Sequence, residues 1–189
     1  MKRLLLVALV LTAGCSGGSS TAQPSGTSTP TPTASPTPAT AASLVLEVDG
    51  LGVSDGAAHI SHFPFATTTA AQIQGIVSPL LGSGVTTTLP ECGQGPRTSY
   101  KARGLTLLFD KAAWVGWTSQ TAGLTTADGV GVGVTRKVVD ASGTAFTFSE
   151  SSLGTEFTAE NSGLGGLMSG PDKTDTVTAL YTGETCFAR

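Results

Sequence analysis

Asp49-Gly50-Leu51-Gly52-Val53 and Asp128-Gly129-Val130-Gly131-Val132 are two copies of one short pattern, separated by 79 positions. A helix-like stretch follows each copy, and stretches rich in Thr, Phe and Trp, which favour strands, follow each helix. Because the order of elements repeats together with the pattern, we predict a tandem duplication with repeats over roughly residues 43–120 and 121–189.

The first repeat is expected to open with a strand, followed by a glycine-rich turn and one amphipathic helix. Apolar residues alternate over residues 44–48, and three glycines between positions 50 and 56 favour a turn region that continues to residue 65. One of the threonines at 67–69 can cap a helix that Gly82 ends, and Pro79 disturbs its last turn. The apolar stripe of this helix is Ile73, Ile76, Val77, Leu80 and Leu81. Strands are then predicted over residues 85–89, 104–109 and 112–117.

The second repeat is shorter. Thr135 can cap a brief helix that runs to residue 141, with Val138 and Val139 as its apolar contacts. Strands are predicted over residues 144–150, 154–160 and 174–183, with a long Gly- and Ser-rich loop over residues 161–173. Two helices and seven or eight strands indicate an α+β fold: tandem helix-plus-antiparallel-sheet repeats that form one domain, with both helices on one face of the sheet.

The first 15 residues form a separate pattern. Lys2 and Arg3 precede an uncharged apolar run over residues 4–11, and small residues then lead into Cys15. This pattern resembles the lipobox of bacterial lipoproteins. The resemblance implies that a signal peptide over residues 1–14 is removed and that Cys15 receives a diacylglyceryl group. The alternative is an ordinary secretory signal with an unused cysteine nearby.

Residues 16–42 contain no charged and no aromatic residue and are dominated by Ser, Thr, Pro, Ala and Gly. Such a segment buries too little apolar surface to fold, so residues 15–42 are predicted to be a lipidated cysteine and a disordered Thr/Pro/Ser linker. No later apolar run approaches the roughly 20 residues of a membrane-spanning helix. We therefore expect the domain over residues 43–189 on the extracytoplasmic face of the cell membrane, attached only through the lipid.

The remaining two cysteines are expected to form a disulfide. With Cys15 assigned to the lipid, Cys92 and Cys186 are an even pair in an exported chain. Two free thiols of a metal or redox site are the alternative, although the sequence has no CxxC spacing.

The charge of the domain excludes some partners. With Lys2 and Arg3 in the signal, eight of the ten basic residues and all thirteen acidic residues belong to the domain, which gives a net charge of −5. A mildly acidic domain without a basic cluster argues against nucleic acid as a partner.

Several features together resemble lipoproteins of actinobacteria (high-GC Gram-positive bacteria), a group that carries no assigned function. They are the order of elements, the paired DGxGV starts, the linker, and the endings Glu91-Cys92-Gly93 and Gly183-Glu184-Thr185-Cys186. The doubled helix-plus-sheet plan is also similar to the β-lactamase-inhibitor-protein fold, whose tandem repeats present a concave sheet to a partner protein. None of the contact residues of that family can be placed on this sequence, so this resemblance implies a topology only.

No catalytic constellation is visible. The sequence lacks S-x-x-K and H-E-x-x-H, and the match to G-x-S-x-G at Gly52-Val53-Ser54-Asp55-Gly56 lies in the predicted glycine-rich turn region. Only His59 and His62 could act as the base of a scattered triad. A metal site on these histidines would need Asp55, Glu91 or Asp128, and exposed loop histidines are the favoured interpretation.

Two further patterns have simpler explanations. The glycines at 129, 131 and 133 lack the spacing or the lysine of a nucleotide-binding loop. Glu150, Glu156 and Glu160 could line one face of a sheet, but solvated charges explain them better than a glycosidase pair. We expect no enzymatic activity, no cofactor and no metal.

Aromatic residues supply the candidate binding surface. Trp114 and Trp117 lie three positions apart on a predicted strand, so alternation sends one ring into the core and the other outward. An outward ring beside Tyr100 or Tyr181 would form a patch suited to a sugar or a protein. The favoured interpretation is that helices cover one face and a loop covers the other, which buries both tryptophans.

The leading hypothesis is a non-enzymatic, lipid-anchored surface domain that binds an unknown protein or envelope component. The alternatives are a carrier or receptor for an apolar or sugar ligand and, less favoured, an envelope hydrolase. An exposed apolar patch on the sheet would favour protein contact, and a closed pocket with few polar groups would favour a carrier. A histidine within hydrogen-bond reach of Ser, Asp or Glu in a cleft would overturn the leading hypothesis in favour of a hydrolase.

Overall fold

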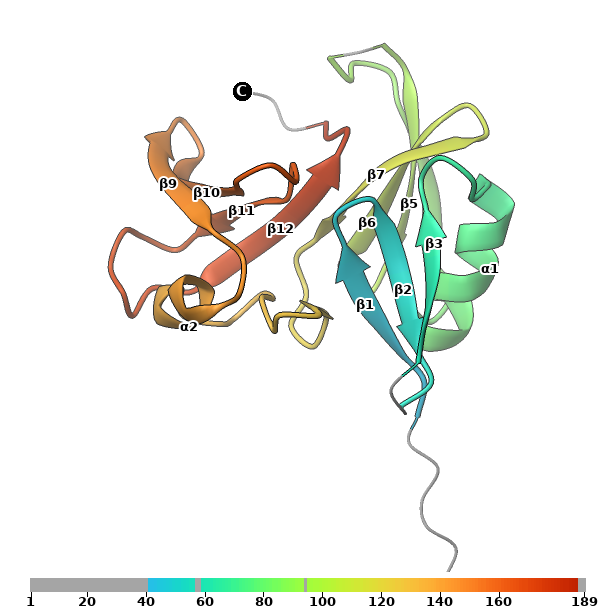
Figure 1. Cartoon of the computed structure of the whole chain (residues 1–189). Coiled ribbons are helices and arrows are strands. Elements are labelled where there is room, and N and C mark those ends of the chain that lie inside the picture. Colours follow the sequence, from blue (N-terminus) through green and yellow to red (C-terminus); the bar gives the residue numbers. More distant parts are fainter. Residues whose placement is uncertain (1–40, 57–58, 94, 187–189) are drawn as a thin grey trace, which may run out of the picture. The chain divides into compact units, whose positions relative to one another are not determined.

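The computed structural model describes residues 41–56, 59–93 and 95–186 (Figure 1). The predicted signal peptide, Cys15 and nearly all of the linker lie outside these residues. No helix in the described ranges is long and apolar enough to cross a membrane.

The described chain is mostly β-sheet, with twelve strands in two sheets and two helices. The smaller sheet has the order β3-β2-β1-β8, and the larger sheet has the order β4-β5-β6-β7-β12-β11-β10-β9. The strands of the smaller sheet are β1 (Ser43–Glu47), β2 (Gly50–Ser54), β3 (Ile60–Pro64) and β8 (Thr125–Thr126). Those of the larger sheet are β4 (Val85–Leu89), β5 (Arg97–Ala102), β6 (Leu105–Asp110), β7 (Ala113–Ser119), β9 (Phe146–Ser151), β10 (Gly154–Ala159), β11 (Gly165–Met168) and β12 (Val177–Gly183). The helices are α1 (Ala70–Leu81) and α2 (Arg136–Ala141).

The larger sheet has a mirrored strand order. The helix α1 precedes the antiparallel series β4–β7, and α2 precedes the antiparallel series β9–β12. The last strands of the two series, β7 and β12, pair antiparallel and join the series into one sheet. The predicted plan of a helix followed by consecutive strands, twice over, is therefore present in the larger sheet. The smaller sheet comes mainly from residues 43–64 and has no full counterpart in the second repeat, so the predicted α+β tandem duplication fits only in part.

Helix α1 follows its sequence signals closely. Thr69 accepts a hydrogen bond from the backbone N–H of Gln72, while the Gln72 side chain accepts one from the N–H of Thr69, so the start is doubly capped. Gly82 ends the helix as predicted, and Pro79 lies inside it. In the shorter α2, Thr135 stands at the N-cap without a side-chain capping bond, and Val138 is 44% exposed, so only Val139 makes the predicted core contact.

The strand predictions are wrong at several places. The predicted turn region that continues to residue 65 contains the strands β2 and β3, the predicted loop over residues 161–173 contains β11, and no strand is predicted over β5 or β8. The glycines that obscured β11 make room for aromatic rings. A Cβ on Gly165 would lie 2.5 Å from the Tyr181 ring, and a Cβ on Gly166 would lie 2.3 Å from the Phe157 ring.

The favoured interpretation of the tryptophans, burial of both rings, is confirmed, and the four residues of the candidate aromatic patch form no surface patch. Trp114 and Trp117 are each 1% exposed, Tyr100 is 6% exposed and Tyr181 is 8% exposed, so all four residues are buried. The register between β6 and β7 shifts at Leu108 and Phe109, and this irregularity cancels the alternation that should have separated the two tryptophans. Trp114 packs edge-on against Phe65, with ring centroids 4.6 Å apart.

The predicted disulfide is present: Cys92 and Cys186 are joined across a sequence separation of 94. Nearby, the guanidinium of Arg97 binds the carboxylate of Glu184 at 2.8 Å, although Arg97 is only 7% exposed. The two links hold the segment after β12 against the end of the sheet that carries β4 and β5. The disulfide therefore ties the first helix-and-strand series to the last strand of the second.

Candidate functional site

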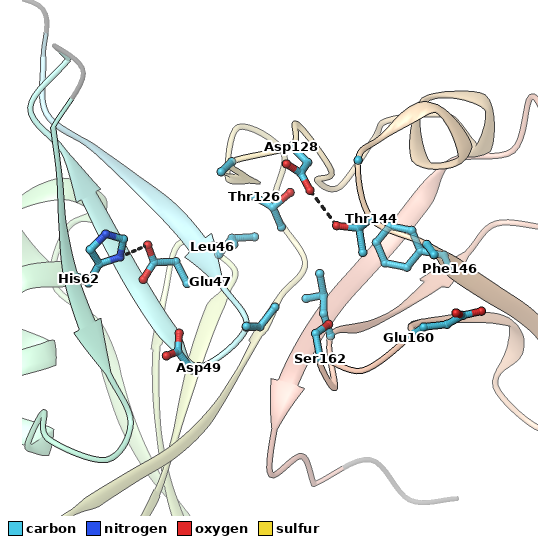
Figure 2. Close-up of a pocket in the computed structure, with 15 residues that line it drawn as sticks. Leu46, Glu47, Asp49, His62, Thr126, Asp128, Thr144, Phe146, Glu160 and Ser162 are labelled. Atoms are coloured by element: carbon cyan, nitrogen blue, oxygen red, sulfur yellow. Dashed lines mark hydrogen bonds and ion pairs between the residues drawn. The ribbon is translucent and has the colours of Figure 1, made fainter.

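A cavity of about 580 Å³ lies between the smaller sheet and the second helix-and-strand series (Figure 2). One wall is the hairpin of β1 and β2, over residues 46–49, together with His62 of β3. The other wall is formed by residues 126–128, by residues 143–146 after α2, and by Glu160, Ser162 and Leu164 between β10 and β11. Residues of the first predicted repeat therefore form one wall of the cavity, and residues of the second form the other.

The hairpin wall is held in place from beneath by Trp117. The indole N–H of Trp117 donates to the backbone carbonyls of Glu47 and Gly50, at 3.1 and 2.8 Å. The hydroxyl of Thr182 donates to the carbonyl of Val48 at 2.7 Å. These bonds fix the turn that carries Glu47 and Asp49, so a buried tryptophan positions the rim of the cavity.

The aspartates that open the two DGxGV copies both line this cavity. Asp49 lies in the turn between β1 and β2, whereas Asp128 lies in a turn closed by hydrogen bonds between Thr126 and Val130. The local backbones differ, because Gly129 has a φ of +79° while Gly50 is a strand residue without a positive φ. In both copies, however, the aspartate lies at the cavity and the apolar residue two positions later is buried.

Glu47 and His62 form an ion pair on the hairpin wall, with 2.6 Å between Oε1 of Glu47 and Nδ1 of His62. Gly52 lies between them in the sheet, and a Cβ there would come within 2.7 Å of the Glu47 carboxylate. Because Gly52 has no side chain, the side chain of Glu47 can cross β2 at this position and reach His62. Burial raises the pKa of the Glu47 carboxyl, an effect that His62 opposes and the nearby charge of Asp49 reinforces.

The opposite wall presents hydroxyls and two more carboxylates. The Thr144 hydroxyl donates to Asp128 at 2.8 Å (Figure 2). Behind this wall, the Thr147 hydroxyl donates to Glu160 at 3.3 Å. The hydroxyl oxygen of Ser162 has almost no exposed surface and no hydrogen-bond partner in the described part of the protein. Such a group is costly to bury unless something in the cavity bonds to it.

The cavity is acidic and partly apolar. Its carboxylates are Glu47, Asp49, Asp128 and Glu160, and its lining contains no lysine or arginine. Val48, which is 41% exposed, and the half-buried ring of Phe146 contribute apolar surface. This lining differs from the closed apolar pocket expected of a carrier for apolar ligands.

His62 meets one condition that was set for a hydrolase, because it lies within hydrogen-bond reach of a carboxylate in a cleft. A carboxylate can orient a histidine as a general base, but a nucleophile must also be hydrogen-bonded to the imidazole. The hydroxyl of Ser162, across the cavity, makes no such bond. Among the described residues, no three His, Cys, Asp or Glu side chains are close enough to hold one metal ion.

Some of the residues that line the cavity are candidates in the sequence analysis, but the sequence does not show that they form one site. His59 is exposed just before β3, while His62 and Asp128, considered together only as metal ligands, line the same cavity. Of the three acidic residues considered on the late strands, Glu160 lines the cavity, whereas Glu150 and Glu156 accept hydrogen bonds from Thr155 and Ser151. The signal that could have found the site is the repeated aspartate at the start of each DGxGV copy.

Known proteins give no further guide, since no family model, curated protein or solved structure matches the chain.

Proposed function

We propose that this protein is a lipid-anchored, non-enzymatic binding module on the extracytoplasmic face of the cell membrane, and that it binds an envelope component or a partner's side chain in the cavity. The observation that carries the proposal is the cavity itself. Its volume of about 580 Å³ falls within the roughly 300–1,000 Å³ typical of ligand sites. Apolar surface and a few converging polar groups, the usual composition of such sites, line it from both sides.

The sequence supports the membrane attachment. The lipobox-like residues 11–15 precede 27 uncharged residues, which could hold the domain on the order of 80 Å from the bilayer if fully extended. Lipid on Cys15 would then be the attachment, and the linker a tether. The mirrored order of β4–β7 and β12–β9 supports the second part of the resemblance, a tandem duplication similar to the β-lactamase-inhibitor-protein fold.

Attachment is tested by growing the producing cells with an alkyne-bearing fatty acid and comparing the wild type with Cys15→Ala. The proposal expects label on the wild type and none on the variant. Equal labelling of both proteins, or of neither, contradicts the lipid anchor.

Ligand binding is tested by screening the isotope-labelled full-length protein against a library of neutral, anionic and cationic fragments, with NMR chemical shifts as the readout. The proposal expects binding fragments to shift signals of residues 46–49, 126–128 and 143–146 together. Ala127→Trp, which fills the cavity at an exposed lining position, should abolish the shifts. Val85→Trp on the exposed edge strand β4 is the matched control and should leave them unchanged. A library that shifts none of these residues contradicts the proposed function.

A further inference from the structure

We infer that the cavity selects an organic cation: a ligand whose ammonium or guanidinium group is carried on a small apolar body. This inference rests on the proposed function, because it names the chemical class of ligand for the same cavity.

The carboxylates of the cavity carry negative charge that no lysine or arginine of the described protein neutralises. Basic side chains of the described protein neutralise acidic residues elsewhere: Arg97 pairs with Glu184 and Asp110, and Lys173 pairs with Asp140. Among the described residues that line the cavity, the only ion pair is that between Glu47 and His62, and His62 is charged only when protonated. Asp49, Asp128 and Glu160 line the cavity without a lysine or arginine partner among the described residues.

The spacing of the carboxylates favours a polyatomic cation over a metal ion. A calcium ion takes six to eight oxygen ligands at about 2.3–2.6 Å, which requires several side chains at one point. The described acidic residues form no cluster of three that could surround one ion. Figure 2 shows them instead around the cavity, with Asp49 on the hairpin wall and Asp128 and Glu160 on the opposite wall. Charges spread in this way suit a polyatomic cation that occupies the space between them.

The aromatic part of the cavity lining, Phe146, also suits an organic cation, and this observation does not depend on the acidic residues. Phe146 is stacked edge-on against Phe157, with ring centroids 5.3 Å apart, so its ring is fixed where it lines the cavity. An aromatic face attracts an ammonium or guanidinium group, and its apolar carbons accept the body of the ligand.

The carboxylates should contribute unequally. Glu47 is already engaged by His62, and its pKa is raised by burial, so part of its negative charge is offset. Asp49 and Asp128 are exposed at the rim and carry their charge toward the opening. For a cation about 6 Å from one such carboxylate, at an effective dielectric constant of about 40, removal of the charge weakens binding roughly 3- to 10-fold.

The test uses three probes of one shape and different charge: benzylamine, benzyl alcohol and benzoate. Each is titrated into the isotope-labelled full-length protein, and the shifts of cavity residues report the affinity. We expect benzylamine to bind at least tenfold more tightly than the other two, and to weaken as ionic strength rises from 0.05 to 0.5 M. Asp49→Asn, Asp128→Asn and Glu160→Gln should each weaken benzylamine binding roughly 3- to 10-fold. Glu91→Gln, which removes the same charge outside this cavity, is the control and should have little effect.

Two blocked tripeptides, acetyl-Ala-Lys-Ala-amide and acetyl-Ala-Gln-Ala-amide, distinguish a basic side chain from a free amine as the source of the cation. Binding of the lysine peptide alone, at an affinity comparable to that of benzylamine, identifies a side chain; binding of benzylamine alone identifies a free amine. Benzoate or benzyl alcohol binding in the cavity as tightly as benzylamine would overturn the inference and leave the proposed function intact. If no probe of any charge shifts the cavity residues, both fail. Urea unfolding of each variant confirms that a lost shift does not reflect a lost fold.

Discussion

Gly52→Ala tests whether the second glycine of the DGxGV pattern exists to let Glu47 reach His62. The new Cβ would lie 2.7 Å from the Glu47 carboxylate and 2.7 Å from Cγ2 of Ile60. The Glu47 contact is to the flexible end of a side chain, and the Ile60 methyl group can move by rotation about χ1, so the strand can persist while both side chains move. The matched control is Gly143→Ala in the same cavity, where the nearest atoms are Asp128 carboxylate oxygens at 3.9 and 4.0 Å. Neither glycine has a positive φ, so alanine fits both backbones.

The magnitude follows from three contributions. Replacing glycine by alanine at a compatible position stabilises by about 0.4–1 kcal/mol through the unfolded chain, and this gain applies to both variants. Gly52→Ala also loses the partly exposed pair between Glu47 and His62, about 0.5 kcal/mol, and forces two side chains from their rotamers at about 0.5–1.5 kcal/mol each. We therefore expect Gly52→Ala to be destabilised by about 1–2 kcal/mol and Gly143→Ala to be slightly stabilised. The difference between them is about 2 kcal/mol.

Two assays report the outcome: urea unfolding of both variants, and the NMR titration of the Glu47 side-chain carboxyl. In the wild type, burial raises the pKa of Glu47. In Gly52→Ala the carboxylate is displaced toward solvent, so its midpoint should fall toward the ordinary value of a glutamate. If Gly52→Ala has the stability of Gly143→Ala and leaves the Glu47 midpoint unchanged, the role assigned to Gly52 is wrong.

Three further predictions concern the cores and links that support the cavity. Because the disulfide closes a loop of 94 residues, Cys92→Ala with Cys186→Ala should lower the free energy of unfolding by up to about 4–5 kcal/mol in urea; an unchanged midpoint contradicts this. Glu47→Gln changes the pH dependence. A raised carboxyl pKa makes the folded wild type bind more protons than its unfolded chain, so this group's contribution to stability is greatest below its ordinary pKa and falls as pH rises through the raised value. The stability of Glu47→Gln relative to wild type should therefore increase from pH 4 to pH 7, and a decrease would refute the sign. Trp117→Phe removes the N–H that binds two carbonyls of the β1–β2 turn, so we expect a loss of about 2–3 kcal/mol in urea unfolding together with weaker benzylamine binding. Unchanged amine affinity would mean that Trp117 does not position the rim.

Local signals in the sequence were sufficient for much of the fold. The apolar stripe and caps of α1, the alternation in β1, and the parity of the cysteines each depend on short-range chemistry or on chain-wide counting. The elements that were missed depend on contacts distant in sequence. Gly165 and Gly166 weaken the local preference for a strand, yet the rings of Tyr181 and Phe157 occupy the space where their side chains would be. The residues next to Gly165 in the sequence do not show that these two rings lie there.

The candidate site was less predictable for the same reason. Asp49 and Asp128 are 79 positions apart, and only the packing of the smaller sheet beside the second helix-and-strand series brings them to one cavity. Burial of both tryptophans was the favoured interpretation, but the two rings were expected on opposite faces of the strand. An irregularity in the pairing of β6 and β7, invisible in the sequence, changes which face Trp114 occupies. The sequence shows that the aspartate is repeated, but it does not show that the two copies lie at the same cavity.

The most direct test of the central claim is a crystal structure of the full-length protein with benzylamine. The account predicts the aromatic ring of the ligand against Phe146 and its ammonium nitrogen about 2.7–2.9 Å from a carboxylate oxygen of Asp49, Asp128 or Glu160. Benzylamine bound elsewhere on the protein, or bound in the cavity with its ammonium turned away from all of these carboxylates, would contradict it.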